Sequence, residues 1–371
     1  MSGFRAGAAT GDNGMAAVAA AWARAGGAPE GANLGFLYLS EEAAPAFADA
    51  LAWLQRESGI AEWVGGIALG VCGDGLETVD APAASLLVGR LPPDGFRAFG
   101  LDRPGDPPLG ATDAGWIARA TPTLAIVHGD PRDQGLPAML DGLADATGAF
   151  LVGGLMTTAV PATHAAGGRR AGGVSGVLLG ADVAVATGLS QGCSPIGPQR
   201  QVTAADANVV LALDGRPALE VMLEDIGPEM AADLRRAAGR LFVAFPVAGS
   251  DRADYLVRNL VAIDPRRGWV AVAENVSPGD RLFFCTRDRE AAAADLQRML
   301  ADLVRRGGRE AKAAVYCSCI ARGPNLFGPD AAEMAAIRAA LGPVPIAGFF
   351  ANGEIFHTRL YGYTGVLTLF L

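Results

Sequence analysis

The chain has 371 residues, of which 51% are apolar, so it is long enough to bury one large core or two medium ones. Its 39 acidic residues outnumber 30 basic ones, and the net charge of -9 opposes binding to a phosphate backbone or an anionic membrane surface. No apolar run reaches the roughly eighteen residues that a membrane span needs. These features exclude nucleic-acid and membrane partners.

Compartment and source are also indicated by composition. The apolar residues 15–23 follow Asp12 and have only Arg5 before them, which is not typical of a signal peptide. Five cysteines without a CxxC pair are typical of thiols that are kept reduced. Lys312 is the only lysine, as in the arginine-rich proteins of GC-rich bacterial genomes. We therefore expect a cytoplasmic, bacterial protein.

Helical spacing alternates with apolar strands along the first half. Apolar residues recur at helical spacing in residues 15–25, 47–54 and 136–143. Strands are predicted at residues 34–39, 63–69, 85–91, 95–99, 124–127, 150–156, 174–179 and 183–189, and the apolar strand 34–39 should be buried on both faces. This alternation predicts an α/β chain.

The stretch Thr187–Thr203, near the midpoint, differs from its surroundings. Two glycines and two prolines fill four of the seven positions from 192 to 198, which predicts a loop with tight, partly left-handed turns. Its polar side chains are short or planar, and Arg200 carries the only charge. Such a loop suits the capture of a small ligand by backbone groups. An ordinary connection between strands is the alternative.

The second half returns to the same alternation. Pro217 fits the first turn of a helix over 218–225, and helical spacing recurs at 296–303 and 334–341. Strands are predicted at residues 209–213, 241–246, 255–263, 269–273, 282–285, 314–320 and 345–350.

An internal repeat follows from the order of these elements. Segments 139–179 and 334–369 both run from a helix through a Gly-containing apolar strand and a polar, His-containing loop to a second strand. Gly154 then corresponds to Gly348, and His164 to His357. Residues 47–88 form a weaker third copy. We expect two similar domains with mixed β-sheets and packed helices, divided into residues 1–205 and 206–371.

Common catalytic and cofactor motifs are missing. The sequence has no GxGxxG, phosphate-binding GK[ST], GxSxG or HExxH motif, which favours a role other than catalysis. Cys317 and Cys319 share one face of a predicted strand, but two thiols do not make a zinc site. Either thiol could act as a nucleophile with His357 as base, so a cysteine-dependent hydrolase is one alternative.

Candidate ligand-binding residues lie at strand ends and in Gly-rich loops. Glu354 could accept a ligand amine, and arginines paired with asparagines could clamp a carboxylate. We expect residues 191–194 and 352–354 to line one cavity. The full candidate set is Gln191, Gly192, Cys193, Ser194, Arg258, Asn259, Arg322, Asn325, Asn352 and Glu354.

The sequence has three histidines, and each is a candidate ligand of a haem iron. His128 directly follows a buried strand, and with His164 and His357 it is a candidate axial ligand. The candidate loops are nevertheless rich in Gly, Ser, Asn and Gln, which suit a compact polar ligand better than a macrocycle. We expect neither a metal nor another cofactor.

Several motifs together identify a family resemblance. They include Gly188-Leu-Ser-Gln-Gly-Cys-Ser-Pro-Ile-Gly-Pro198, Arg322-Gly-Pro-Asn-Leu-Phe-Gly328 and Gly348-Phe-Phe-Ala-Asn-Gly-Glu354. Over nearly its full length the chain resembles a FIST protein, with a FIST N domain followed by a FIST C domain. The resemblance implies an intracellular sensory module that binds small ligands such as amino acids and takes part in bacterial signalling. It implies no catalytic residues.

The sequence and the resemblance together favour a ligand-binding sensory domain. We expect it to bind a small polar metabolite and to act in signal transduction through a separate protein partner such as a kinase. Because some members of the family resemble haem-dependent nitric-oxide sensors, a haem-binding sensor is the second alternative.

Overall fold

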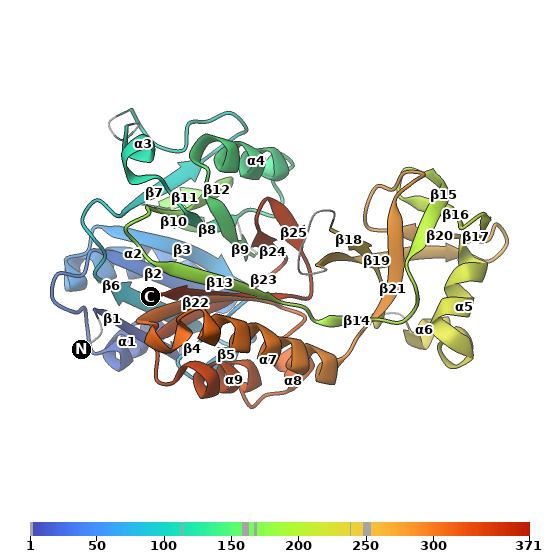
Figure 1. Cartoon of the computed structure of the whole chain (residues 1–371). Coiled ribbons are helices and arrows are strands. Elements are labelled where there is room, and N and C mark those ends of the chain that lie inside the picture. Colours follow the sequence, from blue (N-terminus) through green and yellow to red (C-terminus); the bar gives the residue numbers. More distant parts are fainter. Residues whose placement is uncertain are drawn as a thin grey trace. The chain divides into compact units, whose positions relative to one another are not determined.

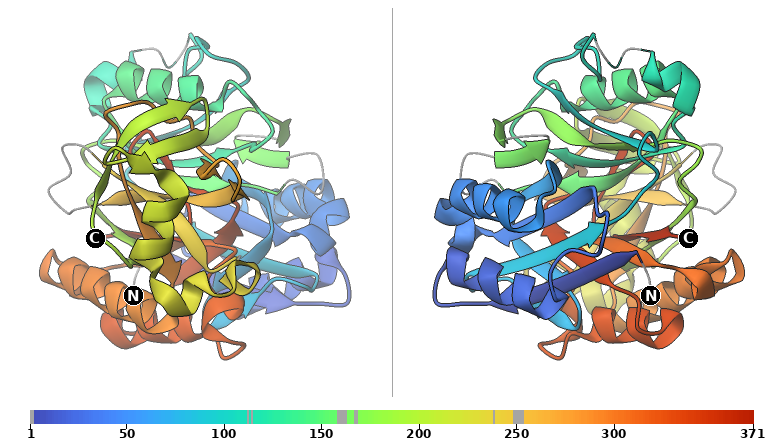
Figure 2. Two further views of the ribbon diagram at one scale, coloured as in Figure 1. Left: turned by 90° about the vertical axis from the view of Figure 1, so that its right-hand side faces the viewer. Right: turned by 90° about the vertical axis from the view of Figure 1, so that its left-hand side faces the viewer.

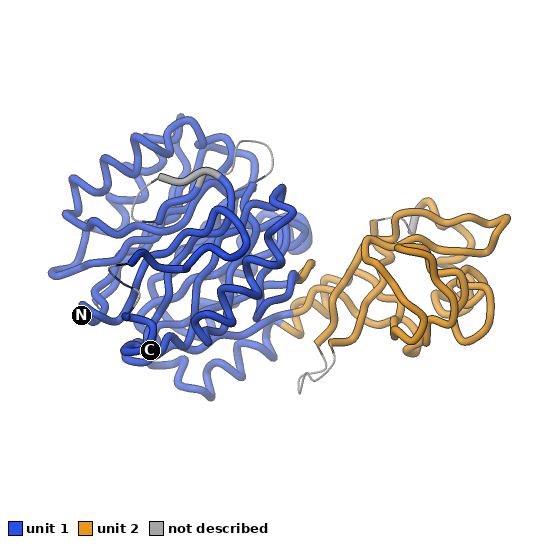
Figure 3. The backbone as a smooth tube through the Cα atoms, turned by 90° about the horizontal axis from the view of Figure 1, so that it is seen from above, with its two compact units in different colours: residues 1–190, 296–360, 364–371 blue, residues 191–295, 361–363 orange. Residues whose placement is uncertain are grey.

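The computed structural model describes residues 3–111, 113, 115–157, 163–166, 169–237, 239–247 and 254–371. The chain is a mixed α/β protein with several mixed sheets, as the sequence predicts (Figure 1). It divides into two compact units (Figure 3). Unit 1 comprises residues 1–190, 296–360 and 364–371, and unit 2 comprises residues 191–295 and 361–363. Unit 1 thus draws on both ends of the sequence.

The described residues of unit 1 form three six-stranded mixed sheets. The first runs in the order β1 (Phe4–Thr10), β6 (Ala83–Gly89), β2 (Leu34–Ser40), β3 (Glu62–Ala68), β10 (Thr163–Ala166), β11 (Arg169–Ala171). The second runs β7 (Phe96–Leu101), β12 (Val174–Leu179), β8 (Leu124–Gly129), β9 (Phe150–Leu155), β24 (Glu354–Phe356), β25 (Arg359–Tyr361). The third runs β13 (Val185–Ser190), β26 (Gly365–Phe370), β22 (Ala313–Cys319), β23 (Ile346–Ala351), β4 (Gly70–Gly73), β5 (Leu76–Thr78).

Helices cover one face of each sheet of unit 1 (Figure 2). On the opposite faces, residues of the three sheets pack against one another, as Tyr38, His128 and Phe349 do, so the central strands are apolar on both sides. The first sheet packs against α1 (Gly14–Ala25) and α2 (Phe47–Ser58), the second against α3 (Trp116–Ala120) and α4 (Leu136–Thr147), and the third against α7 (Arg289–Arg305) and α9 (Ala332–Leu341). The short helices η1 (Glu41–Ala46), η2 (Gly308–Glu310) and α8 (Pro324–Phe327) complete unit 1.

The same arrangement therefore occurs three times within the described part of unit 1. Each repeat has a parallel strand pair, β2 with β3, β8 with β9 and β22 with β23, and each pair is followed by a hairpin. The hairpin never joins the sheet of its own repeat. Hairpin β4–β5 joins the third sheet, β10–β11 the first, and β24–β25 the second. The predicted internal repeat is confirmed, including the copy in residues 47–88.

One glycine in the second strand of each parallel pair aligns the three repeats. Gly65 pairs with Leu37, Gly153 with Val127 and Gly348 with Tyr316. A Cβ at each of these glycines would lie 2.0 to 2.2 Å from the carbonyl oxygen of its partner, and all three partners belong to the helix-covered clusters. Gly348 therefore corresponds to Gly153, and the predicted correspondence with Gly154 is wrong by one residue.

The predicted correspondence of His164 with His357 is wrong. On the exchanged hairpins, His164 pairs with Gly66 and Glu354 pairs with Gly154, so His164 corresponds to Glu354. His357 instead follows β24, with a φ of 59°. The sequence alignment failed because the loop before each hairpin differs in length.

The three sheets meet at a buried aromatic group with one member from each. Tyr38, His128 and Phe349 are inaccessible to solvent, and their ring centroids are 4.6 to 5.7 Å apart. The Tyr38 hydroxyl lies 3.1 Å from Nε2 of His128. Burial, and secondarily the nearby His164, lowers the pKa of His128 to about 3, so this imidazole is neutral.

Unit 2 is built around a closed antiparallel barrel. Its strands run in the order β21 (Arg281–Arg287), β15 (Arg200–Asp206), β16 (Val209–Leu213), β20 (Trp269–Val272), β19 (Tyr255–Asp264), β18 (Leu241–Pro246), and β18 pairs with β21 again. Strand β14 (Cys193–Pro195) also pairs with β21, β17 (Arg216–Pro217) pairs with β16, and helices α5 (Ala218–Ala231) and α6 (Leu234–Ala237) complete the unit. Valine, leucine and phenylalanine side chains fill the barrel.

The Gly- and Pro-rich stretch leads into this barrel rather than forming one long loop. It contains the end of β13, all of β14 and the start of β15. The expected left-handed turns are wrong, because neither Gly192 nor Gly197 has a positive φ. Gly197 is needed for space instead, since a Cβ there would lie 2.9 Å from Cβ of Asp225.

Candidate ligand site

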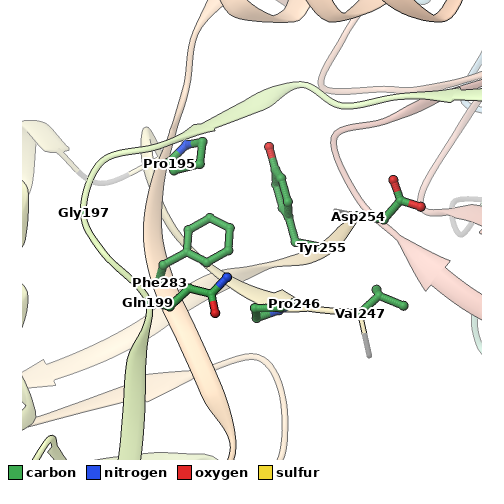
Figure 4. Close-up of a pocket in the computed structure, with 8 residues that line it drawn as sticks. All are labelled: Pro195, Gly197, Gln199, Pro246, Val247, Asp254, Tyr255 and Phe283. Atoms are coloured by element: carbon green, nitrogen blue, oxygen red, sulfur yellow. The ribbon is translucent and has the colours of Figure 1, made fainter. Parts of the chain in front are cut away.

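A pocket of about 450 Å³ lies in unit 2, beside the Gly- and Pro-rich stretch (Figure 4). Its volume falls in the range of about 300–1,000 Å³ that is usual for small-molecule sites. The lining residues are Pro195, Gly197, Gln199, Pro246, Val247, Asp254, Tyr255 and Phe283. They come from the stretch itself, from strands β18, β19 and β21, and from Val247 and Asp254, which directly follow β18 and precede β19.

Strand pairing positions the wall opposite the stretch. Pro246 at the end of β18 pairs with Tyr255 at the start of β19, and the Val247 N–H donates to the Asp254 carbonyl over 2.8 Å. Phe283 on β21 is brought next to them because β21 pairs with β18. The pocket is therefore formed by strand residues together with residues that lie just beyond the strand ends.

Arg200 fixes the stretch to the barrel. Its Nε lies 3.0 Å from Asp225 Oδ2, and its Nη1 lies 3.2 Å from Asp214 Oδ2. Hydrogen bonds and charge from Asp225, and to a smaller extent from Asp214, raise the pKa of Arg200. The guanidinium therefore stays charged and ion-paired with both carboxylates. Arg200 therefore anchors the wall formed by Pro195, Gly197 and Gln199.

Tyr255 joins the two walls of the pocket. Its ring packs edge-on against Phe283, with centroids 5.1 Å apart, and its hydroxyl donates to the Cys193 carbonyl. Gln191 Nε2 donates to the Tyr255 carbonyl over 3.4 Å. Burial, followed by the neighbouring Cys193, raises the pKa of Tyr255, so the phenol keeps the proton that it donates.

Two thiols lie beside this tyrosine. Cys193 and Cys285 are free and buried, and a hydrogen bond between them, with burial, raises the pKa of Cys285. A thiol with a raised pKa forms little thiolate, so Cys285 is poorly suited to nucleophilic chemistry. The two cysteines belong to the apolar cluster below the pocket, together with Phe283.

A second polar cluster lies inside unit 1, around Arg322. Its side chain is inaccessible to solvent, and its Nε and Nη2 donate to Glu333 Oε1 over 2.9 and 2.7 Å. Tyr316 donates to the same oxygen, and Ser318 and the Gly323 N–H donate to Oε2. Arg322 Nη1 has no hydrogen-bond partner among the described residues. The pair is a buried ion pair with nearly complete hydrogen bonding.

Two further buried carboxyl groups belong to this cluster. Burial raises the pKa of Glu77 to about 7, although Met334 N–H donates to it over 2.8 Å. Burial likewise raises the pKa of Glu354 to about 7, against two hydrogen bonds from Thr364. Both groups exchange protons near neutral pH.

The ten candidate residues divide between the two units. In unit 2, Gln191 and Cys193 are buried beside Tyr255, and Gly192 is buried between them. Ser194 is half-buried and pairs with Thr286. Arg258 is ion-paired with Glu274 at 2.8 Å, and Asn259 accepts a hydrogen bond from Tyr363 over 2.7 Å.

The other four candidates lie in unit 1. Arg322 and Glu354 are buried in the cluster described above, whereas Asn325 and Asn352 are exposed. Asn325 Nδ2 donates to the Ile320 carbonyl over 2.8 Å. That residues 191–194 and 352–354 share a cavity stays a prediction.

Sequence reasoning missed most of the pocket. It selected polar side chains, whereas half of the lining residues are proline or aromatic. Two signals pointed there nonetheless: Pro195, Gly197 and Gln199 lie in the stretch singled out from composition, and Tyr255 begins the predicted strand 255–263. Phe283 gave no sequence signal of its own.

The haem-binding and hydrolase alternatives depend on the surroundings of the histidines and of Cys317. His128 does not fit an axial haem ligand, because its Nε2 faces the Tyr38 hydroxyl and its ring is packed between Tyr38 and Phe349. Cys317 is buried, and burial raises its pKa, which disfavours a nucleophilic thiolate. His357 is exposed and packs on Phe150.

Two properties bear on the class of protein. None of the described helices combines the length and apolarity that a membrane crossing requires. Within the described residues, no three His, Cys, Asp or Glu side chains gather as a metal site would need. The fold and the pocket define a mixed α/β protein with a ligand-sized cavity beside a β-barrel.

Comparison with known proteins places the chain in a family. The FIST N domain model matches residues 33–216, and the FIST C domain model matches residues 218–357. The chain belongs to the FIST family, whose domains are described as small-ligand-binding sensory domains in signal transduction.

Its relatives include mycobacterial proteins. An uncharacterised protein of Mycobacterium tuberculosis is 32% identical over 389 aligned positions, which cover 96% of each chain. An uncharacterised protein of Mycobacterium bovis is 31% identical over 249 positions, covering 61% of this chain and 62% of the relative.

Proposed function

We propose that this protein is a cytoplasmic sensor that binds a small metabolite in the unit 2 pocket and signals through a separate protein partner such as a kinase. The family supplies the general role of small-ligand sensing in signal transduction. In this proposal, the ligand binds in the pocket beside the Gly- and Pro-rich stretch. No catalytic step is part of the proposal.

The observation that carries the proposal is the position of the pocket on this stretch. Three lining residues, Pro195, Gly197 and Gln199, belong to one short segment, and Tyr255 connects that segment to the opposite wall. A ligand in contact with both walls would stabilise their closed arrangement relative to an open one. Such a difference in affinity is what a sensor needs to convert occupancy into a change of state.

The test is a thermal-shift screen of a metabolite library. A ligand at a hundred times its dissociation constant should stabilise the protein by about 2.7 kcal/mol. Gln199 is exposed and lines the pocket, so Gln199→Trp should fill the space without disturbing the core.

Gln201→Trp is the matched control. Gln201 is also exposed, lies two residues further along, and does not line the pocket. Hits that stabilise the wild type and Gln201→Trp but not Gln199→Trp support the proposal. Hits that stabilise all three equally would place the binding site elsewhere and overturn it.

A further inference from the structure

Each repeat of unit 1 has an equivalent strand at the edge of its sheet. The strand that precedes the parallel pair is β1 in the first repeat, β7 in the second and β13 in the third. Among the described strands, each pairs on one side only, antiparallel with β6, β12 and β26 respectively. Half of the main-chain N–H and C=O groups of each edge strand therefore point away from the sheet.

Arginines of long helices bind outward carbonyl groups on two of these edges. On β1, the Ala8 carbonyl accepts a hydrogen bond from Arg24 Nη1 over 2.7 Å. On β13, the Leu189 carbonyl accepts one from Arg298 Nη2 over 3.2 Å. Arg24 belongs to α1, which has 12 residues, and Arg298 belongs to α7, which has 17. Both edges are thus partly blocked to a further strand.

The equivalent helix of the second repeat is too short to do the same along β7. Helix α3 has five residues and is about 8 Å long. Strand β7 has six residues and is about 20 Å long. The arginine of α3, Arg119, lies 3.8 Å from Asp94 rather than at a carbonyl of β7.

Hydrogen bonding on β12 shows which groups of β7 point outward. The Thr123 N–H donates to the Leu179 carbonyl, so Leu179 and every second residue before it point toward β8. The residues between them point toward β7, where their partners are residues 97, 99 and 101. The main-chain groups of Phe96, Ala98 and Gly100 therefore point away from the sheet.

Two of these three residues have free main-chain groups on this side. The Phe96 carbonyl accepts a hydrogen bond from Arg97 Nη1 over 2.8 Å. Among the described residues, the outward N–H and C=O groups of Ala98 and Gly100 have no hydrogen-bond partner, and both residues are partly exposed. The edge also lacks the usual protection, because β7 contains no proline, lysine or bulge.

Charge favours a different protein over a second copy of this chain. Residues 94–119, which form β7 and its flanks, contain four aspartates and three arginines, and the whole chain has a net charge of -9. Pairing of β7 with β7 of a second copy would bring two surfaces of the same negative charge together. A segment with lysines or arginines meets no such repulsion.

We propose that a separate protein docks on β7 by adding an extended, positively charged segment as a further strand beside Ala98 and Gly100. This inference rests on the proposed function, since it describes how the signalling partner of that function binds. Main-chain hydrogen bonds to the edge contribute affinity, and alternate side chains of the added strand contribute specificity.

The test selects peptides on the full chain from a phage-displayed library of random twelve-residue sequences. Selected peptides should be rich in lysine, arginine and β-branched residues. Ala98→Pro removes one outward N–H but no hydrogen bond to β12, and it should weaken peptide binding at least tenfold. Ala6→Pro, at the equivalent position of β1, is the matched control and should leave peptide binding unchanged.

Methylation of the peptide tests the same contact without altering the protein. In an added strand every second amide N–H faces β7. Methylating one of these nitrogens should weaken binding about tenfold, the effect of losing one hydrogen bond, whereas methylating an intervening nitrogen should change it less.

The other outcomes would overturn the proposal. They are that no peptide is selected, that the selected peptides bind Ala98→Pro as tightly as the wild type, and that methylation shows no alternation. Light scattering tests the second copy: a dimer that Ala98→Pro converts to a monomer would assign the edge to self-association instead. The unit 2 pocket is judged separately by Gln199→Trp in the metabolite screen, which uses no peptide.

Discussion

The hydroxyl of Tyr255 donates a hydrogen bond to the main-chain carbonyl of Cys193, and this contact ties strand β19 to strand β14 across the edge of the pocket. Cys193 precedes Pro195 on the Gly- and Pro-rich stretch, so the bond sets the distance between the two pocket walls.

Tyr255→Phe should therefore weaken both the fold and the site. Removing the hydroxyl leaves the Cys193 carbonyl without this donor, which costs about 1–3 kcal/mol for a buried group. Denaturant unfolding measures the loss. Tyr363→Phe is the matched control, because Tyr363 also loses a hydrogen bond, to Asn259, but at an exposed site. Equal losses in both variants would contradict the role given to the Tyr255 contact.

A second prediction concerns the buried ion pair between Arg322 and Glu333 in unit 1. Arg322→Met removes the partner of Glu333 and leaves a buried carboxylate, which should cost about 3–5 kcal/mol of unfolding free energy. Arg216→Met breaks ion pairs with Glu220 and Glu224 that are half-exposed, and should cost about 1 kcal/mol or less.

A double variant separates charge from packing at the same place. Arg322→Met combined with Glu333→Gln should recover part of the stability that Arg322→Met loses, because no uncompensated charge remains. If the double variant is less stable than Arg322→Met alone, the buried carboxylate is not the cause of the loss.

Stability should depend on pH through Glu77 and Glu354. Their folded pKa of about 7 lies above the ordinary value of 4.5, so the folded state holds more protons between these pH values. Their contribution to stability is fully present below pH 4.5 and is lost as the pH rises through 7. Each carboxyl accounts for about 3 kcal/mol at most.

Glu77→Gln and Glu354→Gln should remove this dependence. Relative to the wild type, each variant should gain unfolding free energy as the pH rises from 4.5 to 7.5, as measured by urea unfolding at several pH values. Glu30→Gln, at an exposed position, is the control and should follow the wild type. A constant difference between Glu77→Gln and the wild type across this range would refute the assignment.

The glycine shared by the repeats should not tolerate a side chain. A Cβ at Gly348 would lie 2.2 Å from the Tyr316 carbonyl oxygen and 2.7 Å from Cys72 Sγ, so Gly348→Ala should cost about 1–3 kcal/mol. Gly142 lies in helix α4 with nothing within 4 Å of its Cβ position, and Gly142→Ala should stabilise the protein by about 0.5–1 kcal/mol. Thermal unfolding of the two variants should therefore shift in opposite directions.

Hydrophobic periodicity was enough to predict the local elements and the repeat. The spacing of apolar residues identifies a strand at residues 34–39 and a helix at residues 47–54, and this spacing does not depend on how the elements pack. The match of Gly348 to Gly154 was one residue out of register, because Gly153 and Gly154 are adjacent in the same apolar strand and the sequence does not show which of them lies against the neighbouring strand.

The exchange of hairpins could not be predicted in this way. Strand β4 has four residues and pairs with β23, and Cys72 and its partner Gly348 lie far apart in the sequence. No local pattern indicates such a partner. The unit 2 barrel was not predicted for a related reason. Its strands were predicted one by one, but the barrel closes only because β18 pairs with β21, and no local pattern indicates that pairing.

The candidate site was predicted only in part. Composition singled out the stretch that supplies Pro195, Gly197 and Gln199, because Gly and Pro restrict the backbone locally. The opposite wall depends on Tyr255 and Phe283. An aromatic residue in a strand can lie in the core or line a pocket, and the sequence does not distinguish the two positions.

The central claim is that the ligand binds in the unit 2 pocket, and amide hydrogen exchange with and without a ligand from the thermal-shift screen tests it most directly. Binding should slow exchange at residues 196–199 and 254–255 in the wild type and in Gln201→Trp, and should have no effect in Gln199→Trp. Protection confined to unit 1, around Arg322 and Glu354, with residues 196–199 unchanged, would contradict the claim.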